Sequence, residues 1–159
     1  VFDEESKKKI LPCVIESSFG VERAFLVFMF DSFFYDKSKD NIVLKLHPKL
    51  SSIKAAVFPI VKRDDYDKIA EGITEDLKKE FNVSYDRSGS IGKRYARNDE
   101  AGTPFCITGD EDSLKNKDAT VRDRDTTKQV RVKISELRDA LRKLIDKKTN
   151  FEEIGKPKK

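Results

Sequence analysis

An alternation of buried strands and amphipathic helices most constrains what this chain can fold into. Residues 53–61, IKAAVFPIV, form an almost continuous apolar run of the length of a strand buried on both faces. Asp64 can cap the segment that follows. Its apolar residues recur at helical spacing, namely Tyr66, Ile69, Ala70, Ile73 and Leu77. A short strand over 83–86 comes next. Strand, helix and strand in this order predict an α/β domain with helices packed on a sheet.

The same alternation continues toward the C-terminus. A turn at 88–92 leads into an expected short helix over 93–101, which Gly102 ends, and PFCIT at 104–108 is another buried strand. Residues 120–125 and 129–134 predict a β-hairpin. Ser135 is expected to cap a last helix whose core face is Leu137, Leu141, Leu144 and Ile145. The charged tail FEEIGKPKK is expected to fray. These segments predict a mixed five-stranded sheet flanked by helices.

The first 46 residues differ in character. Residues 10–16 resemble a strand, and residues 21–35 predict a helix that is apolar almost all round and rich in phenylalanine. A helix without a polar face must be buried on all sides, and one strand cannot cover it. We therefore divide the chain into residues 1–46, the tail of a larger domain or a docking surface for another chain, and residues 47–159, a self-consistent domain.

Composition excludes several classes of protein. The net charge of +4 is too small to indicate a nucleic-acid partner by itself, although 37% hydrophobic residues can supply a core. Cys13 and Cys106 are far apart, which fits a reduced intracellular protein without a disulfide framework or a metal site. His47, beside a proline, is expected to be a surface residue. No signal peptide is visible, and the longest apolar run is too short to span a membrane.

Basic residues gather first around SGSIGKRYAR, residues 88–97. Glycines at a turn into a helix can present backbone N–H groups to an anion. A nucleotide P-loop is excluded, because that motif needs a glycine where Arg87 stands and Ser or Thr where Arg94 stands. Two readings stay open for Lys93, Arg94 and Arg97. They bind the backbone of a polyanion, or they form a solvated face balanced by nearby acids.

The second basic group lies in the predicted hairpin VRDRDTTKQVRVK, residues 121–133. With Thr126 and Thr127 as a two-residue loop, Arg122 faces Arg131 and Arg124 faces Gln129. One face of the hairpin then carries basic residues, namely Arg122, Arg124, Arg131 and Lys133, and the other face carries valines. Like charges directly opposite each other cost stability unless an anion or a carboxylate lies beside them. Two partners remain possible. One is RNA, and the other is a carboxylate of the chain, such as Asp86 or an acidic residue of an adjacent strand.

Three segments together resemble one family, the glycyl-tRNA synthetases, which are class II aminoacyl-tRNA synthetases. VIESSFGVER (14–23) resembles the third class-defining motif. YDRSGSIGKRYARNDEAGTPFCIT and TVRDRDTTKQVRV resemble stretches of the anticodon-binding domain. The chain departs from the family at Ser17, where proline is usual, and at Arg87, where aspartate is more usual. The resemblance implies a class IIa anticodon-binding domain, preceded by a strand–helix remnant of the antiparallel catalytic domain.

The resemblance also implies site residues and ligands. Arg23, with Gly20, would bind ATP, which is used with Mg²⁺, and Glu16 and Ser18 would contact glycine. The tRNA-binding candidates are basic residues of the two groups above: Lys93, Arg94, Arg97, Arg122, Arg124, Arg131 and Lys133. The implied partners are the anticodon arm of glycine tRNA and the remainder of the catalytic domain, in a homodimeric parent in the cytoplasm or mitochondria, with no membrane.

The residue types suit these roles. A carboxylate pairs with an ammonium group, and a guanidinium can bind phosphate oxygens through two parallel hydrogen bonds. The other two class II motifs are not found in these residues, so we expect this chain alone to be inactive. The alternative is a non-catalytic relative that uses the anticodon-binding fold as a nucleic-acid or protein interaction module. The upstream reading frame of the gene would distinguish the two.

Overall fold

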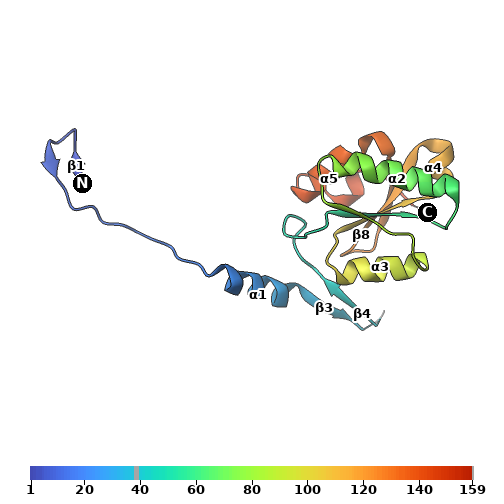
Figure 1. The fold of residues 1–159 in the computed structure, drawn as a ribbon, viewed down its shortest axis with the longest axis horizontal. Helices are drawn as coiled ribbons and strands as arrows, with labels where there is room; N and C mark the ends of the chain where they lie inside the picture. Colours follow the sequence, from blue (N-terminus) through green and yellow to red (C-terminus); the bar gives the residue numbers. More distant parts are fainter. Residues whose placement is uncertain (38–39, 159) are drawn as a thin grey trace.

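A computed structural model describes residues 1–37 and 40–158 of the chain, and its centre is a six-stranded mixed sheet (Figure 1). The strand order is β10-β9-β8-β7-β5-β6. The strands are β5 (Ala55–Pro59), β6 (Val83–Tyr85), β7 (Phe105–Gly109), β8 (Asp118–Asp123), β9 (Gln129–Lys133) and β10 (Lys156–Pro157). β5 is parallel to both β6 and β7, whereas the β7–β8, β8–β9 and β9–β10 pairs are antiparallel. The α/β class and the mixed sheet predicted from the sequence are confirmed.

Two helices close the apolar face of this sheet. α2 (Asp64–Lys78) connects β5 to β6, and α5 (Leu137–Ile145) follows β9. Their apolar residues pack with the strand residues that point to this face, and Val57, Ile107 and Val121 there are at most 1% exposed. This is the main hydrophobic core, and its burial is the largest favourable contribution to folding. Figure 1 shows α2 and α5 together on one side of the sheet.

The opposite face of the sheet carries a single long helix, α3 (Ile91–Glu100). Here a smaller apolar cluster joins Ala56, Phe58 and Cys106 to Ile91 and Tyr95. A hydrogen bond of 2.9 Å joins the Tyr95 hydroxyl to the Thr108 hydroxyl. Beyond α3, this face becomes polar along β8 and β9, so polar pairs rather than apolar burial must complete it.

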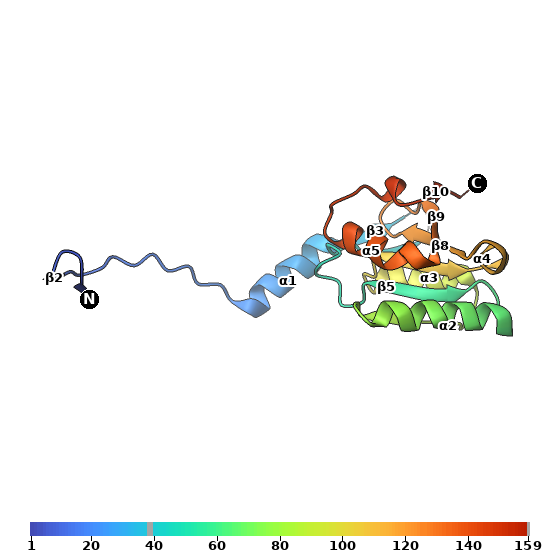
Figure 2. The same cartoon turned by 90° about the horizontal axis from the view of Figure 1, so that it is seen from above.

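The N-terminal region leaves this domain as a long arm (Figures 1 and 2). It contains β1 (Phe2–Asp3), β2 (Lys8–Lys9), the helix α1 (Val21–Ser32), and an antiparallel pair of β3 (Phe33–Asp36) and β4 (Asn41–Leu44). Within the described stretch 1–37, residues 10–20 adopt neither helix nor strand. The strand expected over 10–16 is therefore wrong. Ile10 exchanges backbone hydrogen bonds with Val1, and the rest of this segment is exposed to solvent.

The phenylalanine-rich helix is shorter than expected. α1 ends at Ser32, and the last expected helical residues form β3 instead. Phe25 and Phe30 are 64% and 75% exposed. The arm lies outside the main sheet, and the apolar surface of α1 is open in this chain, as expected for a helix that one strand cannot cover.

The C-terminal half departs from the expectations at three places. The tail after α5 does not fray but forms a 3-10 turn, η2 (Phe151–Glu153), and then β10, which adds a sixth strand at the edge of the sheet. A short helix, α4 (Glu111–Asn116), was not expected. The expected capping residues are also displaced. Asp64 is the first residue of α2 after Arg63, and Ser135 lies in η1 (Ile134–Glu136) ahead of α5.

The hairpin register is two residues from the expected one. Arg122 faces Gln129 and Thr120 faces Arg131, so the two arginines are not directly opposite. The cause is the loop, where the Asp123 carboxylate accepts hydrogen bonds from the backbone N–H (2.8 Å) and hydroxyl (2.6 Å) of Thr126. Such a carboxylate-capped turn holds more residues than a two-residue loop. A shift of two keeps every side chain on its expected face.

The close packing of Gly155 against β9 makes the attachment of β10 testable. A Cβ at this position would lie 2.2 Å from the Arg131 carbonyl oxygen. We expect Gly155→Ala to expel β10 and lower the free energy of unfolding by about 1–3 kcal/mol. In hydrogen exchange, the Lys158 amide, which donates to Gln129 O at 3.0 Å, should lose its protection.

Gly72→Ala is the matched control, since a Cβ there meets nothing within 4 Å and lies within α2. It should raise the free energy of unfolding by about 0.5–1 kcal/mol. Equal stability of the two variants would contradict the pairing of β10 with β9.

Candidate nucleic-acid interface

The basic turn at the start of α3 is held in shape by its own residues. The Ser90 side chain caps the helix by accepting from the Lys93 amide at 3.4 Å. The Asp86 carboxylate accepts from the Ser88 amide (2.8 Å) and from the Arg97 guanidinium, which also donates to Ser88 O. This leaves Lys93 exposed and Arg97 about half exposed at the outer surface of α3. Both can contact a phosphate without rearrangement of the turn.

Arg94 points inward instead. Its side chain is buried, with the residue 2% exposed, and its guanidinium donates to the carbonyl oxygens of Pro59 and Gly89. The guanidinium carbon lies 6.0 Å from the centre of the Phe58 ring. Arg94 therefore ties the turn before α3 to the end of β5, and it is not displayed to a ligand at the surface.

Arg122 is paired inside the domain. Its guanidinium makes two hydrogen bonds to the Asp99 carboxylate, of 2.7 and 2.9 Å, and the two side chains are 7% and 6% exposed. The guanidinium carbon also lies 4.7 Å from the centre of the Tyr95 ring. Since Asp99 is in α3 and Arg122 is in β8, this bidentate pair fastens the helix to the sheet.

Arg131 is the centre of a second polar cluster on the same face. It donates to Asp110 at 2.9 Å through each of its two terminal nitrogens, and to Asp118 and Thr120 as well. Burial alone would raise the pKa of Asp110. Its hydrogen bonds and charge interaction with Arg131, helped by Ser113, outweigh that effect and lower the pKa to about 2. The sequence left two possible partners for the hairpin arginines, RNA or a carboxylate. In the structure, carboxylates of this chain are the partners of Arg122 and Arg131.

Four of the seven tRNA-binding candidates thus have largely buried guanidinium groups that are bound within the chain, whereas Arg97 is bound to Asp86 but about half exposed. The four are Arg94, Arg122, Arg131 and Arg124, the last of which is 2% exposed. Lys93, Arg97 and Lys133 remain at the surface, although Lys133 also donates to Asn116 O at 2.8 Å. Strand alternation predicts on which face the hairpin arginines lie, but it does not predict which carboxylates or carbonyl oxygens they bind there.

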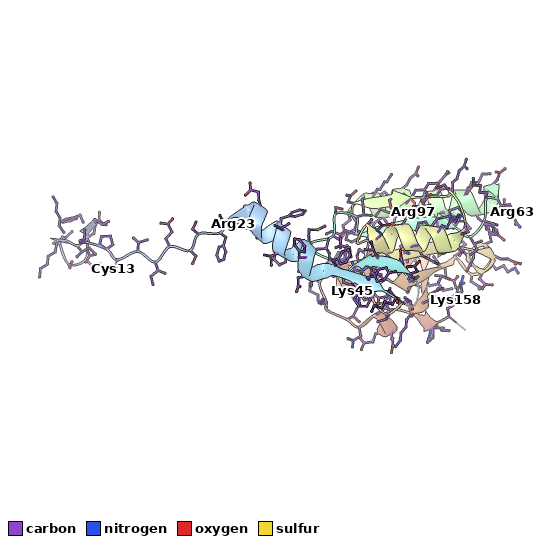
Figure 3. The ribbon with its side chains drawn as sticks, turned by 90° about the horizontal axis from the view of Figure 1, so that it is seen from below. Cys13, Arg23, Lys45, Arg63, Arg97 and Lys158 are labelled. Carbon is purple, nitrogen blue, oxygen red and sulfur yellow. The ribbon has the colours of Figure 1, made fainter. Side chains whose placement is uncertain are left out.

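The structure adds two basic residues that sequence reasoning missed. Lys156 and Lys158 are exposed at β10, the strand next to β9. No periodic signal could identify a two-residue strand in a charged tail, although a glycine before KPK could have suggested a turn back to the sheet. Figure 3 views the molecule from the α3 side, with Arg97 and Lys158 both labelled. We name Lys93, Arg97, Lys133, Lys156 and Lys158 the helix-side basic surface.

The residues of the third-motif segment lie far out on the arm. Glu16 and Ser18 are in the extended exposed stretch, Gly20 is the N-cap of α1, and Arg23 is exposed in its first turn. Figure 3 shows Arg23 at the beginning of α1. These four residues are neighbours in the sequence, and all of them are exposed on the arm rather than enclosed in a pocket with the sheet domain.

The remaining reactive groups have no catalytic arrangement in the described part of the chain. Burial raises the pKa of the Cys106 thiol to about 12, whereas Cys13 is exposed. His47 is half-buried rather than fully at the surface, and its pKa is lowered by burial and then by Lys147, Lys49 and Lys54. Among residues 1–37 and 40–158, no group of three His, Cys, Asp or Glu residues could hold a metal ion.

In the same described residues, no helix is long and apolar enough to cross a membrane.

Comparison with known proteins gives a consistent result. The family model described as an anticodon binding domain matches residues 54–144. A protein named Glycine--tRNA ligase from Rhodopirellula baltica is 47% identical over 142 residues, which are 85% of this chain and 26% of that protein.

Two further proteins of the same name come from other bacteria. The one from Corynebacterium glutamicum is 43% identical over 88% of this chain and 32% of its own length. The one from Geobacillus kaustophilus is 46% identical over 90% of this chain and 31% of its own length. The chain therefore spans about a quarter to a third of the length of the curated relatives it matches.

The Arg122–Asp99 pair predicts a large effect of removing one partner. Asp99→Ala leaves a buried guanidinium without its carboxylate and should lower the free energy of unfolding by about 3–5 kcal/mol. Glu100→Ala, at the next and exposed position of α3, should change it by less than about 0.5 kcal/mol. Urea unfolding followed by circular dichroism measures both. A small effect of Asp99→Ala would mean that the pair does not fasten α3.

The lowered pKa of Asp110 predicts a pH dependence. A carboxylate whose pKa is lower in the folded state than its ordinary 3.8 stabilises the fold above that value. The stabilisation is lost as the pH falls through about 2. Asp110→Asn should therefore flatten the dependence of unfolding free energy on pH between about 5 and 2. Asp65→Asn, a surface substitution, should keep the wild-type slope, and an unchanged slope in Asp110→Asn would contradict the prediction.

Proposed function

The chain belongs to the anticodon-binding domain family, and on that premise we propose that it recognises the anticodon arm of glycine tRNA as part of a glycine–tRNA ligase. The observation that carries the proposal is the family match over residues 54–144, from β5 into α5, in a chain whose similar proteins are named Glycine--tRNA ligase. The helix-side basic surface supports it, because its cations are exposed and can reach phosphates, including Arg97 and Lys158, which also lie beside Asp86 and Asp110.

In the proposed complex, Lys93 and Arg97 contact the RNA backbone from α3, and Lys133, Lys156 and Lys158 extend the contact along the sheet edge. Sequence-specific RNA recognition usually targets unstacked loop bases, and backbone contacts set their register. The buried arginines have a different role, since they hold α3 and the strands at the spacing that keeps these lysines in place.

In the parent enzyme, the arm would belong to the catalytic domain. Arg23, with Gly20 beside it, would bind the ATP phosphates, and Mg²⁺ would accompany the nucleotide. The exposed guanidinium of Arg23 at a helix N-terminus suits that ligand, because both the cation and the helix dipole attract anions. Glu16 and Ser18 would contact the glycine ammonium group. The exposed phenylalanines of α1 would be covered by the remainder of the catalytic domain, in a homodimeric parent.

Binding to an RNA hairpin with the anticodon-arm sequence of glycine tRNA tests the proposal. The double variant Lys93→Ala/Arg97→Ala should weaken binding and lower the slope of log affinity against log salt by about 1.5, because two phosphate contacts are removed. Fluorescence anisotropy across a salt titration measures both quantities.

The matched control is Lys68→Ala/Lys143→Ala, which removes the same charge from exposed positions of α2 and α5, on the opposite side of the sheet. It should leave the slope unchanged. Equal slopes for both double variants would exclude the helix-side basic surface. If a hairpin with a scrambled anticodon bound equally well, the alternative, a general nucleic-acid module, would be favoured.

A further inference from the structure

A short segment, residues 43–51, joins the arm to the sheet domain, and Arg124 is bonded to it. Arg124 follows β8 directly, and its guanidinium donates to Leu46 O and to Gly102 O, each at 2.9 Å. Asp125 accepts from the same guanidinium at 2.8 and 3.0 Å. The residue is 2% exposed, and its bond to Leu46 connects positions 78 apart in sequence. One side chain therefore connects the hairpin, the end of α3 and the joining segment.

Two other polar side chains hold the same segment. The Ser51 hydroxyl donates to Gly102 O at 2.8 Å, so this carbonyl accepts from both Ser51 and Arg124. The Lys54 ammonium donates to three carbonyl oxygens, those of Pro48 (3.0 Å), Lys49 (2.8 Å) and Ser51 (2.6 Å). An ammonium group has three N–H donors, so its capacity is fully used within the segment.

Apolar packing completes the joint. Val43 and Leu44 of β4 are 7% and 9% exposed. Gly102 has a φ of +78°, and a Cβ there would lie 3.1 Å from Leu44 Cδ2 and 3.3 Å from Leu44 O. Only glycine allows both this backbone conformation and this approach. β4 is thus seated against the turn that Arg124 and Ser51 hold.

The paired strands β3 and β4 connect α1 to this joint. α1 runs directly into β3, and the Phe33 amide still bonds to Phe30 O. β3 pairs with β4 from Phe33 opposite Leu44 onward, and the Lys45 amide donates to Ser32 O at 2.7 Å. Figure 2 shows α1 leading away from the sheet domain at this point. The direction of α1 is therefore set where β4 meets the domain.

We propose that Arg124 is a positioning residue that locks this joint and fixes the direction of α1 relative to the sheet domain. Arginine suits the task because its planar fork reaches two carbonyl oxygens and a carboxylate together, which the single ammonium of lysine does not reproduce. The functional consequence rests on the proposed function. In the parent enzyme the joint sets the separation between the ATP-binding residue Arg23 and the anticodon-binding surface.

Distances between spin labels test the lock without RNA. Cys13→Ser removes the exposed thiol, and Cys106 is too buried to be labelled. Labels are placed at exposed positions of α1 and α2 through Glu22→Cys and Glu71→Cys. With Arg124 intact, we expect a single narrow distance distribution. Arg124→Met should make it at least about twofold broader, because the joining segment then behaves as a flexible linker.

Arg142→Met is the matched control. Its guanidinium is about half exposed and pairs with Glu80, which follows the end of α2, away from the joint. The distribution in this variant should stay narrow. If Arg124→Met does not fold, Arg124→Lys takes its place, since lysine keeps the charge and loses the fork; it too should broaden the distribution.

Two results would overturn the proposal. One is an unchanged width in the folded Arg124 variant. The other is broadening accompanied by loss of hydrogen-exchange protection in β5 and β7, which would make Arg124 a general stability residue. Because no RNA is present, failure of the joint and failure of anticodon-arm binding are separate outcomes.

Discussion

The bidentate pair between Arg122 and Asp99 is the interaction on which the α3 side of this domain depends. The opposite face of the sheet is closed by apolar burial under α2 and α5, which requires no particular partner for any one side chain. The α3 face has only a small apolar cluster, of which Ala56, Phe58 and Cys106 are the buried members. A buried ion pair with good geometry must supply the rest, and it also fixes the helix at one position along the strands.

Arginine has a recurring structural role in this chain. Arg94, Arg122, Arg124 and Arg131 each bind several oxygen atoms from other elements, and Arg94 and Arg124 bind mostly backbone carbonyls. The planar guanidinium, with five donors, can satisfy such groups where a lysine could satisfy fewer. The cations left at the surface for a polyanion are mainly lysines. The chain has 33 basic and 29 acidic residues, which gives the net charge of +4, and several arginines are paired with these acids inside the domain.

The two regions of the chain are connected at the joint, residues 43–51. The sheet domain has its own core. The arm exposes large apolar side chains, among them Phe25 and Phe30. A joint of fixed direction suits the proposed function, in which a tRNA would be held by the sheet domain and joined to glycine at the catalytic domain.

The sequence by itself determined the elements and their faces. Helical and alternating periodicity identified the strands and helices from 53 to 145 except α4, and the parity of the hairpin placed Arg122 and Arg131 on the same face. Parity is a local property, because side chains alternate along any strand. The partners, the two-residue shift in register and the addition of β10 were decided by the tertiary structure. They depend on which carboxylates and strand edges come close in space. Asp99 lies 23 residues from Arg122, and Leu46 lies 78 residues from Arg124. No spacing within the sequence encodes such contacts. These contacts distinguish the arginines that stabilise the domain from the lysines that remain exposed at the surface.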